Sequence, residues 1–367
     1  MNFGFTQEQE MLRDQVRRFM TEACPMSTVR ELTAKDAPFS EKLWDQIASL
    51  GWLGLIVPEQ YGGIGLKWID LALVLEETAR GLSPLPILSQ ALASAAVLRA
   101  GNDEQRANWL PALASGEVRA TLALYDEPNW FDAQAVTLTG IPVDDGIELH
   151  GRKPFVADAM SSNQLLLAYL GPAGLGLAAI GKSQVKVTEE PSMDVTKPTG
   201  SIILDHVQVS ADRLMPISPE DLAYLADCGA VAVTAEMVGA ADTTLTMTSN
   251  YAKERIQFGK PIGQYQGVKH RLADMFVDVE SFRSLLYYAA WCIDDAVGEL
   301  PRAISLAKGY ASDAFVRIGI DGVGLHGAIG FTAEYDVQLY LKRSKWSRPM
   351  YGDSDYHLDR VATLGGI

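Results

Sequence analysis

The sequence is poor in cysteine and histidine, with three cysteines and five histidines in 367 residues. Cys24, Cys228 and Cys292 are far apart and form no Cys-x-x-Cys pair, so neither a disulfide framework nor a cysteine metal site is expected. An odd number of widely spaced thiols is typical of a reducing compartment, and we therefore expect a cytoplasmic protein.

Long hydrophobic runs are also missing. No run of 18 apolar residues without a charge occurs, which predicts no membrane span. Residues 1–6 lack the basic and then apolar segments of a signal peptide, so none is expected. The longest apolar-rich stretch, residues 229–241, is interrupted by Glu236 and is expected to form a buried helix.

Positive charge is scarce relative to negative charge. There are 31 basic and 46 acidic residues, which gives a net charge of −15. A uniformly acidic protein repels phosphate backbones, so nucleic acid is not expected as a partner. Hydrophobic residues make up 48% of the chain, a globular composition, and the length predicts two or three domains.

The common catalytic motifs are absent. The sequence has no phosphate-binding Gly-x-x-x-x-Gly-Lys-Ser/Thr loop, no Gly-x-Ser-x-Gly elbow and no His-Glu-x-x-His zinc motif. Gly324, Gly327 and Gly330 do not form the dinucleotide fingerprint, because no strand precedes them in a βαβ unit. The residues alone therefore indicate no hydrolase and no metalloenzyme.

The order of expected elements is helices, then strands, then helices. Thr6 and Gln9 have the spacing of a capping box, and Gly51 is expected to end a helix that includes Leu43 to Leu50. Further helices are expected over residues 68–80 and 89–114. A helical region is then expected over 219–310, with breaks at 258–261 and 298–301, and it continues to about 317. Another helix is expected over 333–345. Strands are expected over residues 120–125, 134–139, 147–150, 164–169, 177–180, 185–189 and 202–209. Segregated elements of this kind predict an α+β fold.

Four stretches, taken together, resemble the acyl-CoA dehydrogenase family. They are residues 50–63, 193–198 with 204–209, 251–263 continuing to 275, and 325–332; the third contains Arg-x-Gln-Phe-Gly. The resemblance implies an N-terminal helical domain (1–118), a middle β-barrel or sandwich domain (119–216) and a C-terminal four-helix bundle (217–367). It also implies an FAD cofactor, an acyl-CoA substrate, and a homotetramer or a heterotetramer with a homologous chain.

Two groups of residues in the C-terminal part are implied to bind FAD. In the family, the positions of Arg255 and Phe258 reach the FAD of a neighbouring subunit; a guanidinium suits the pyrophosphate and an aromatic ring packs on the ring system. Gly327, Ala328 and Gly330 stand where the family has a His-Gly-Gly-x-Gly loop close to the dinucleotide. Ala328 replaces a glycine, and Gly324 stands where a glutamine is usual.

The middle segment departs further from the family. Residues 124–129 read Leu-Tyr-Asp-Glu-Pro-Asn, where the family has a Thr-Glu-Pro stretch that contacts the isoalloxazine ring. The family's Trp-Ile-Thr segment appears as Phe155, Val156 and Ala157, so the threonine hydroxyl is absent. Phe155 and Val156 are candidates for walling the ring, and a buried pair of strands is the alternative.

The identity of the catalytic base depends on how the sequence is aligned with the family. Removing an α-proton from a thioester needs a carboxylate whose pKa is raised in a dry pocket. The family's Tyr-Glu-Gly-Thr pattern gives no base if it is aligned on Tyr351, because Gly352 follows, but gives Asp353 if it is aligned on Arg360. Some members carry the glutamate at the start of the long helix, where this sequence offers Asp227.

Two functions remain open from the sequence. The first is an FAD-dependent acyl-CoA dehydrogenase in which Asp353 takes the α-proton and an electron-transfer flavoprotein reoxidises the flavin. In the family the thioester oxygen is held by a backbone N–H and a flavin ribityl hydroxyl. The second is a non-catalytic or half-site subunit of a heterotetramer, with the base supplied by a related partner chain.

Overall fold

The computed structural model describes residues 4–34, 39–126 and 133–366. Contacts divide the chain into two compact units, each built from segments that are distant in sequence. The helical unit comprises Met1–Glu31, Ala72–Ser83 and Ala230–Ile367, and the sheet-bearing unit comprises Leu32–Leu71 and Pro84–Gly229. The division into three domains that the sequence predicts (1–118, 119–216 and 217–367) stays a prediction.

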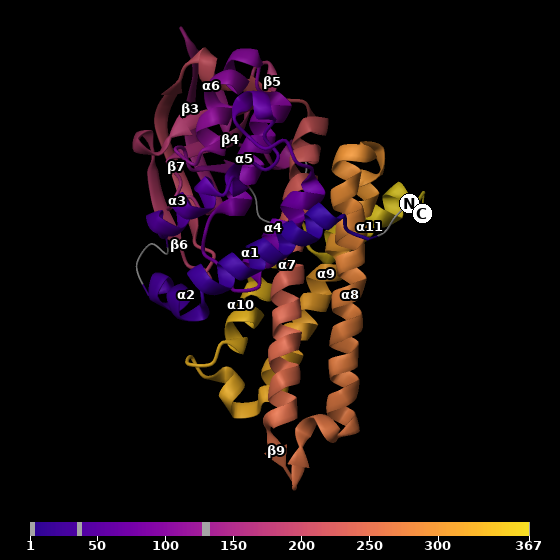
Figure 1. The fold of residues 1–367 in the computed structure, drawn as a ribbon. Coiled ribbons are helices and arrows are strands. Elements are labelled where there is room, and N and C mark those ends of the chain that lie inside the picture. The colour runs from indigo at the N-terminus through magenta and orange to yellow at the C-terminus, as the bar shows by residue number, and fades with distance from the viewer. Residues whose placement is uncertain (1–3, 35–38, 127–132, 367) are drawn as a thin grey trace. The chain divides into compact units, whose positions relative to one another are not determined.

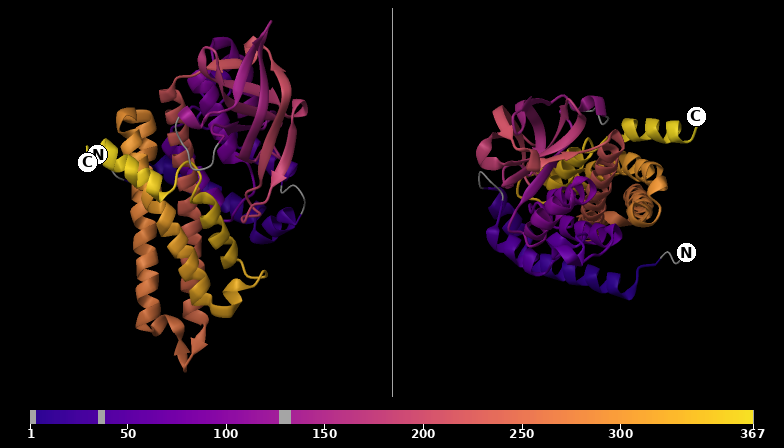
Figure 2. Two further views of the ribbon diagram at one scale, coloured as in Figure 1. Left: turned by 180° about the vertical axis from the view of Figure 1, so that it is seen from behind. Right: turned by 90° about the horizontal axis from the view of Figure 1, so that it is seen from above.

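The helical unit is built mainly from helices. They are α1 (Gln7–Ala23), most of α7 (Pro219–Glu254), α8 (Gln266–Asp295), α9 (Leu300–His326), α10 (Val337–Ser347) and α11 (Ser354–Leu364), together with most of α4 (Trp68–Ala79) and α2 (Met26–Thr33). The helices α7, α8 and α9 run side by side (Figures 1 and 2). At the start of α1, the Thr6 side chain accepts a hydrogen bond from the Gln9 N–H, and the Gln9 side chain accepts one from the Thr6 N–H. This confirms the expected capping box.

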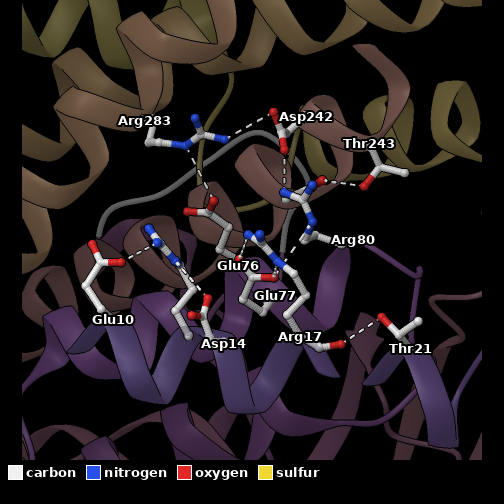
Figure 3. Close-up of polar contacts among 12 residues, drawn as sticks. Glu10, Asp14, Arg17, Thr21, Glu76, Glu77, Arg80, Asp242, Thr243 and Arg283 are labelled. Carbon is white, nitrogen blue, oxygen red and sulfur yellow. Dashed lines mark hydrogen bonds and ion pairs between the residues drawn. The ribbon is translucent and has the colours of Figure 1, made fainter. Parts of the chain in front are cut away.

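A buried polar network crosses the helical unit (Figure 3). Arg17 on α1 forms two hydrogen bonds, of 2.8 and 2.6 Å, with the buried Glu77 on α4. The adjacent Glu76 accepts a 2.6 Å hydrogen bond from Tyr287 on α8, and burial raises the pKa of Glu76. Arg283 lies 3.4 Å from both Glu76 and Asp242 on α7. Because each buried charge has a partner on another helix, the network favours one relative position of these four helices.

The sheet-bearing unit contains the strands of the larger sheet and further helices. Its helices are α3 (Glu41–Ser49), α5 (Ile87–Ala100) and α6 (Asp103–Ala114), and its strands are β1 (Ala120–Ala123), β2 (Thr139–Val143), β3 (Gly146–Ala157), β4 (Gln164–Gly171), β5 (Gly174–Gly181), β6 (Lys186–Glu190), β7 (Thr199–Val209) and β8 (Leu214–Pro216). The strand order is β6-β7-β3-β2-β4-β5-β8, and β1 pairs with β4. Aliphatic side chains such as Leu149, Leu165 and Ile202 form its core. Helical and sheet elements are therefore segregated, and the α+β prediction is confirmed.

The expected strand over residues 134–139 is wrong. Ala133–Ala135 form a short 3-10 helix, and β2 begins only at Thr139. The Asp126 carboxylate accepts the backbone N–H groups of Thr137 and Leu138, so these donors are not available to a neighbouring strand. The sequence also underestimated β3, which continues through two irregularities to Ala157.

Several helices differ from expectation. The single pattern over 89–114 is two helices, because Gly101 caps α5 and Asn102 begins α6 with its own capping box. The helix expected to end near 317 continues to His326. The helix α11 was not expected; Asp353 caps its N-terminus.

Two segments reach the length and mean hydropathy of a membrane-spanning helix, Pro219–Glu254 and Val297–Phe331. In Pro219–Glu254, 89% of the most apolar window is buried within the structure. Length and composition alone are weak evidence for a span, because the core helix of a globular protein meets the same criterion.

Candidate functional site

A short hairpin follows the end of α7 and carries two of the expected cofactor residues. The strands β9 (Ile256–Gln257) and β10 (Lys260–Pro261) pair across a turn made by Phe258 and Gly259. Both turn residues have positive φ, 52° and 80°, as a two-residue type I′ turn requires. The Tyr265 hydroxyl donates to the Gln257 carbonyl at 3.0 Å, which steadies the hairpin.

The hairpin presents its side chains to solvent. Phe258 is 94% exposed, and Arg255 at the base of the hairpin is also exposed. Among the residues that the structure describes, no ion pair engages the Arg255 guanidinium. The label β9 in Figure 1 marks this hairpin beyond the end of α7. An exposed aromatic ring on the turn and a guanidinium without an ion pair at the base of the hairpin are suited to a ligand outside this chain.

The Gly-rich loop after α9 contains the other expected cofactor residues of the helical unit. Gly327 ends α9 with φ 65°, and a Cβ there would meet no atom within 4 Å. At Gly330, by contrast, a Cβ would lie 2.6 Å from the Val323 carbonyl, so the turn requires glycine for its own packing. Ala328 lies between them in a short 3-10 helix. Gly327 therefore leaves an open approach to the backbone, while Gly330 shapes the turn.

A buried lysine fixes the segment that leads to Asp353. Lys308 on α9 is fully buried, and its Nζ donates to Ser312 Oγ at 2.8 Å and to the carbonyls of Arg348 at 2.8 Å and Gly352 at 2.7 Å. Burial lowers the pKa of Lys308 to about 7, against an opposing attraction from Asp353. Three acceptors match the three donors of an ammonium group, so this side chain holds the segment 348–352 at both ends.

A buried histidine holds the same segment from α11. The Nε2 atom of His357 is 3.0 Å from the Tyr351 carbonyl, and its Nδ1 is 3.2 Å from Ser305 Oγ. Burial and the nearby Lys308 lower the pKa of His357 to about 3, so its ring is neutral near neutral pH. A Cβ at Gly309 would lie 3.3 Å from the His357 Cβ, so the small residue makes room for the histidine.

Asp353 sits at the end of this segment, at the N-cap of α11. Its Oδ1 accepts the Tyr356 N–H at 3.1 Å, and the Arg348 guanidinium lies 3.7 Å from Oδ2. That second distance exceeds a hydrogen bond, so Oδ2 keeps its lone pairs available for a proton. The side chain is 31% exposed. Asp353 thus has one oxygen committed to the helix and one open.

The neighbouring position cannot carry the family's glutamate. Gly352 has φ 102°, and a Cβ there would lie 2.4 Å from the Tyr356 ring and 2.8 Å from His357 Nε2. Alignment on Tyr351 therefore leads to a site without room for a side chain. Asp227, the other carboxylate weighed from the sequence, is buried on α7 in the sheet-bearing unit.

In the sheet-bearing unit, Phe155 and Val156 lie at an irregularity of β3. The pairing of β3 with β7 shifts between Lys153 and Val156, and Phe155 has φ 53°. As a result the Phe155 side chain is exposed while Val156 is buried in the sheet core. Phe155 is therefore available to a ligand, whereas Val156 packs into the core of the sheet-bearing unit.

A buried ion pair connects the two stretches in which the family contacts the flavin ring. The Lys153 ammonium on β3 is 2.5 Å from the Asp126 carboxylate, and it also donates to the Leu124 carbonyl at 3.3 Å. Burial lowers the pKa of Lys153 to about 8, against the opposing effect of Asp126. Residues 127–129 of the expected flavin stretch lie outside the described residues. Asp126, in place of a family hydroxyl, is thus committed to holding β3.

Each unit by itself carries features that suit an FAD group. The helical unit offers an unpaired guanidinium at Arg255, an exposed ring at Phe258 and an open backbone at Gly327, which suit an anionic dinucleotide. The sheet-bearing unit offers the exposed ring of Phe155. The donor set suits the cofactor, although Ala157 supplies no hydroxyl to it.

Sequence reasoning missed the residues that hold these segments. Lys308 was detectable as a lone lysine among Ile304, Ala307 and Ala311, because a charge in an apolar stretch of helix needs buried partners. His357 and Lys153 gave no comparable signal, since their partners are backbone carbonyls or residues far away in sequence.

Comparison with known proteins agrees with this arrangement. Residues 6–117 match the family model "Acyl-CoA dehydrogenase, N-terminal domain", and residues 225–364 match "Acyl-CoA dehydrogenase, C-terminal domain". The acyl-CoA dehydrogenase IpdE2 of Mycolicibacterium smegmatis is 29% identical over 357 residues, which cover 97% of this chain and 98% of the relative.

Solved structures match over the whole chain. The ChsE4–ChsE5 complex from Mycobacterium tuberculosis is 25% identical with a TM-score of 0.92, covering 100% of this chain and 99% of the other. An FAD-dependent dehydrogenase is 25% identical with a TM-score of 0.88, and each chain is fully covered. The chain therefore belongs to the acyl-CoA dehydrogenase family of FAD-dependent oxidoreductases that act on CH–CH groups.

Proposed function

We propose that the protein catalyses the α,β-desaturation of an acyl-CoA thioester to an enoyl-CoA, with Asp353 as the base. The observation that carries this proposal is the open Oδ2 of Asp353 at the end of a segment fixed by the buried Lys308. A base must be held in place and must keep a lone pair for the proton, and Asp353 meets both requirements.

The reaction assigns distinct work to the residues. Asp353 accepts the proton as the α-carbon–hydrogen bond breaks, and that electron pair forms the new double bond. When bound, FAD would supply the oxidising chemistry, the acceptor for the hydride equivalent of the β-carbon. Lys308 and His357 keep the backbone before Asp353 in place, while Arg255, Phe258 and Gly327 are the proposed contacts of the dinucleotide. Phe155 is proposed to pack against its ring system.

A screen of acyl-CoA thioesters tests the function. The FAD-loaded protein is mixed without oxygen with linear, branched, dicarboxylic and ring-bearing thioesters, and loss of the flavin absorbance band is followed. Bleaching by one class, with release of the enoyl-CoA, supports the desaturation and identifies the acyl group. Retention of oxidised flavin with every thioester, although FAD stays bound, contradicts it. An electron-transfer flavoprotein is the proposed acceptor, and restoration of the band by such a protein tests that step.

The second candidate is a half-site subunit whose partner chain supplies the base. Gly352, which leaves no room for a glutamate, favours it, and the similar ChsE4–ChsE5 structure is a complex of two named chains. Co-expression with a homologous chain distinguishes the two. Activity that appears only in the mixed complex supports the half-site reading.

Assembly follows from the exposed hairpin. A ring as exposed as Phe258 on a rigid turn gains a favourable environment only from another molecule, and in this family that position serves a neighbouring subunit. We therefore propose a homotetramer or a heterotetramer with a homologous chain. Light scattering of the FAD-loaded protein tests this, and a stable monomer that retains its flavin contradicts it.

A further inference from the structure

Two histidines and two carboxylates gather on one face of the sheet-bearing unit, apart from the residues assigned to the cofactor and the base. Glu148 and His150 lie on β3, and Asp205 and His206 lie on the neighbouring strand β7. His150, Asp205 and His206 each offer one ligand atom, and these atoms lie within 4.8 Å of one another. We propose that these three side chains bind a divalent transition-metal ion of the zinc class.

The strand pairing explains why the side chains meet. Leu149 pairs with Val207 and Gly151 pairs with Leu204, so Asp205 and His206 together oppose the single residue His150. This is a β-bulge, which turns two consecutive side chains toward the same partner. In a regular strand, Asp205 and His206 would point to opposite faces, and only one of them would reach His150.

The backbone at His206 has an unusual conformation. Its φ of 53° lies in the left-handed region, which is unfavourable for a residue with a Cβ and is common at functional positions. The His150 and His206 rings lie 4.6 Å apart between centroids with an angle of 32° between their planes. Two imidazoles held this close repel each other when both are protonated, whereas a shared metal ion attracts both.

Glu148 supplies the outer contact that metal-binding histidines generally have. Its carboxylate is 2.8 Å from His206 Nδ1, which fixes the ring and leaves Nε2 available for the metal. The Glu148 hydrogen bond also raises the pKa of His206. A metal ion binds the deprotonated imidazole, so metal binding competes with protons and weakens in acid.

The ligand types select the kind of ion. Two imidazoles and one carboxylate suit zinc, cobalt, nickel or copper, whereas calcium and magnesium prefer oxygen ligands. A tetrahedral zinc ion needs ligand atoms about 3.4 Å apart, from bonds of about 2.0–2.1 Å. The side chains are exposed by 58%, 85% and 64% for His150, Asp205 and His206, so small rotations can close the remaining gap. Three protein ligands leave a position for water, and the ion would join β3 to β7.

The test uses the full-length protein without a histidine tag, stripped of metal and returned to chelator-free buffer. Zn²⁺ is titrated by calorimetry, and Co²⁺ is titrated by its visible absorption, which reports nitrogen ligands and coordination number. We expect one equivalent to bind. Glu148→Gln, which removes only the outer contact, should weaken binding about 10- to 100-fold.

Two ligand variants and one control complete the test. His150→Gln and His206→Asn should weaken Zn²⁺ binding more than Glu148→Gln does, and Asn tolerates the left-handed conformation at 206. His270→Gln changes an exposed histidine of α8 and should leave the affinity unchanged. Binding weaker than millimolar, or equal binding by the two ligand variants and the wild type, overturns the proposal.

Discussion

Two loops of the helical unit are built in opposite ways. The segment 348–353 is fixed by side chains that are themselves buried, Lys308 and His357, which bond to its carbonyls. The hairpin that carries Arg255 and Phe258 is held by its own backbone turn, and its side chains face solvent. Under the proposed function, the first loop positions the base within this chain, and the second offers its side chains to a molecule beyond it.

The strongest way to test the first loop is to remove the proton-accepting oxygen. Asp353→Asn should lower the rate of flavin reduction by substrate at least about 100-fold, because a general base contributes about 10²–10⁴-fold. Asparagine is also a good N-cap, so α11 should stay folded and FAD should stay bound. Rapid-mixing absorbance measures the rate.

Asp227→Asn and Asp353→Glu complete that experiment. If Asp227→Asn abolishes reduction while Asp353→Asn does not, the base is the buried carboxylate of α7. Appreciable activity in Asp353→Glu supports the alignment on Arg360. If neither asparagine variant loses activity and turnover requires a homologous chain, the base belongs to that chain.

The role of the hairpin is tested by measuring the affinity for FAD. Arg255→Ala removes a charge-assisted contact of about 1.5–3 kcal/mol, which corresponds to roughly 10- to 100-fold in FAD affinity. Arg255→Lys should recover only part of it, since an ammonium lacks the planar fork. Lys253→Ala, at an exposed position two residues earlier, is the control. Unchanged flavin retention after extensive dialysis of Arg255→Ala would count against the contact.

How far the sequence predicted these loops depends on the range of the interactions. The capping box at Thr6, the break at Phe258 and Gly259, and the helix–strand–helix order all follow from residues close in sequence. The strand expected at 134–139 failed because Asp126, eleven residues before Thr137, takes the backbone donors. Lys308 reaches Gly352 across 44 residues, so no local pattern reports that contact.

The contribution of Lys308 to the stability of the segment 348–352 can be measured. Lys308→Met leaves the carbonyls of Arg348 and Gly352 without their donor, which should lower the free energy of unfolding by about 1–3 kcal/mol. Urea unfolding measures this, with the exposed Lys269→Met as the matched control. A variant that is more stable and fully active would show that the buried charge of Lys308 lowers the stability of the fold and is not needed to hold the segment.

The smallest effect concerns pH. The folded chain keeps His357 neutral because its pKa is lowered to about 3, whereas the unfolded chain takes up a proton near pH 6.5. The unfolded state therefore binds more protons between these values, and stability falls as the pH falls, by up to about 1.4 kcal/mol per pH unit. Urea unfolding at pH 7, 6 and 5 should show a shallower decline in His357→Gln, and no change of slope in His270→Gln. Parallel declines in the wild type and His357→Gln would contradict this role.

Gly352 limits how the family's glutamate could be introduced into this chain. Gly352→Glu changes one residue, but its Cβ would collide with the Tyr356 ring at 2.4 Å, and its φ of 102° disfavours any side chain. A designer would have to replace Tyr356 as well and rebuild the turn, so the two substitutions would act non-additively. Asp353→Glu meets no such obstacle from the backbone, because Asp353 has extended φ and ψ. A longer carboxylate can therefore be introduced at position 353 without rebuilding the backbone.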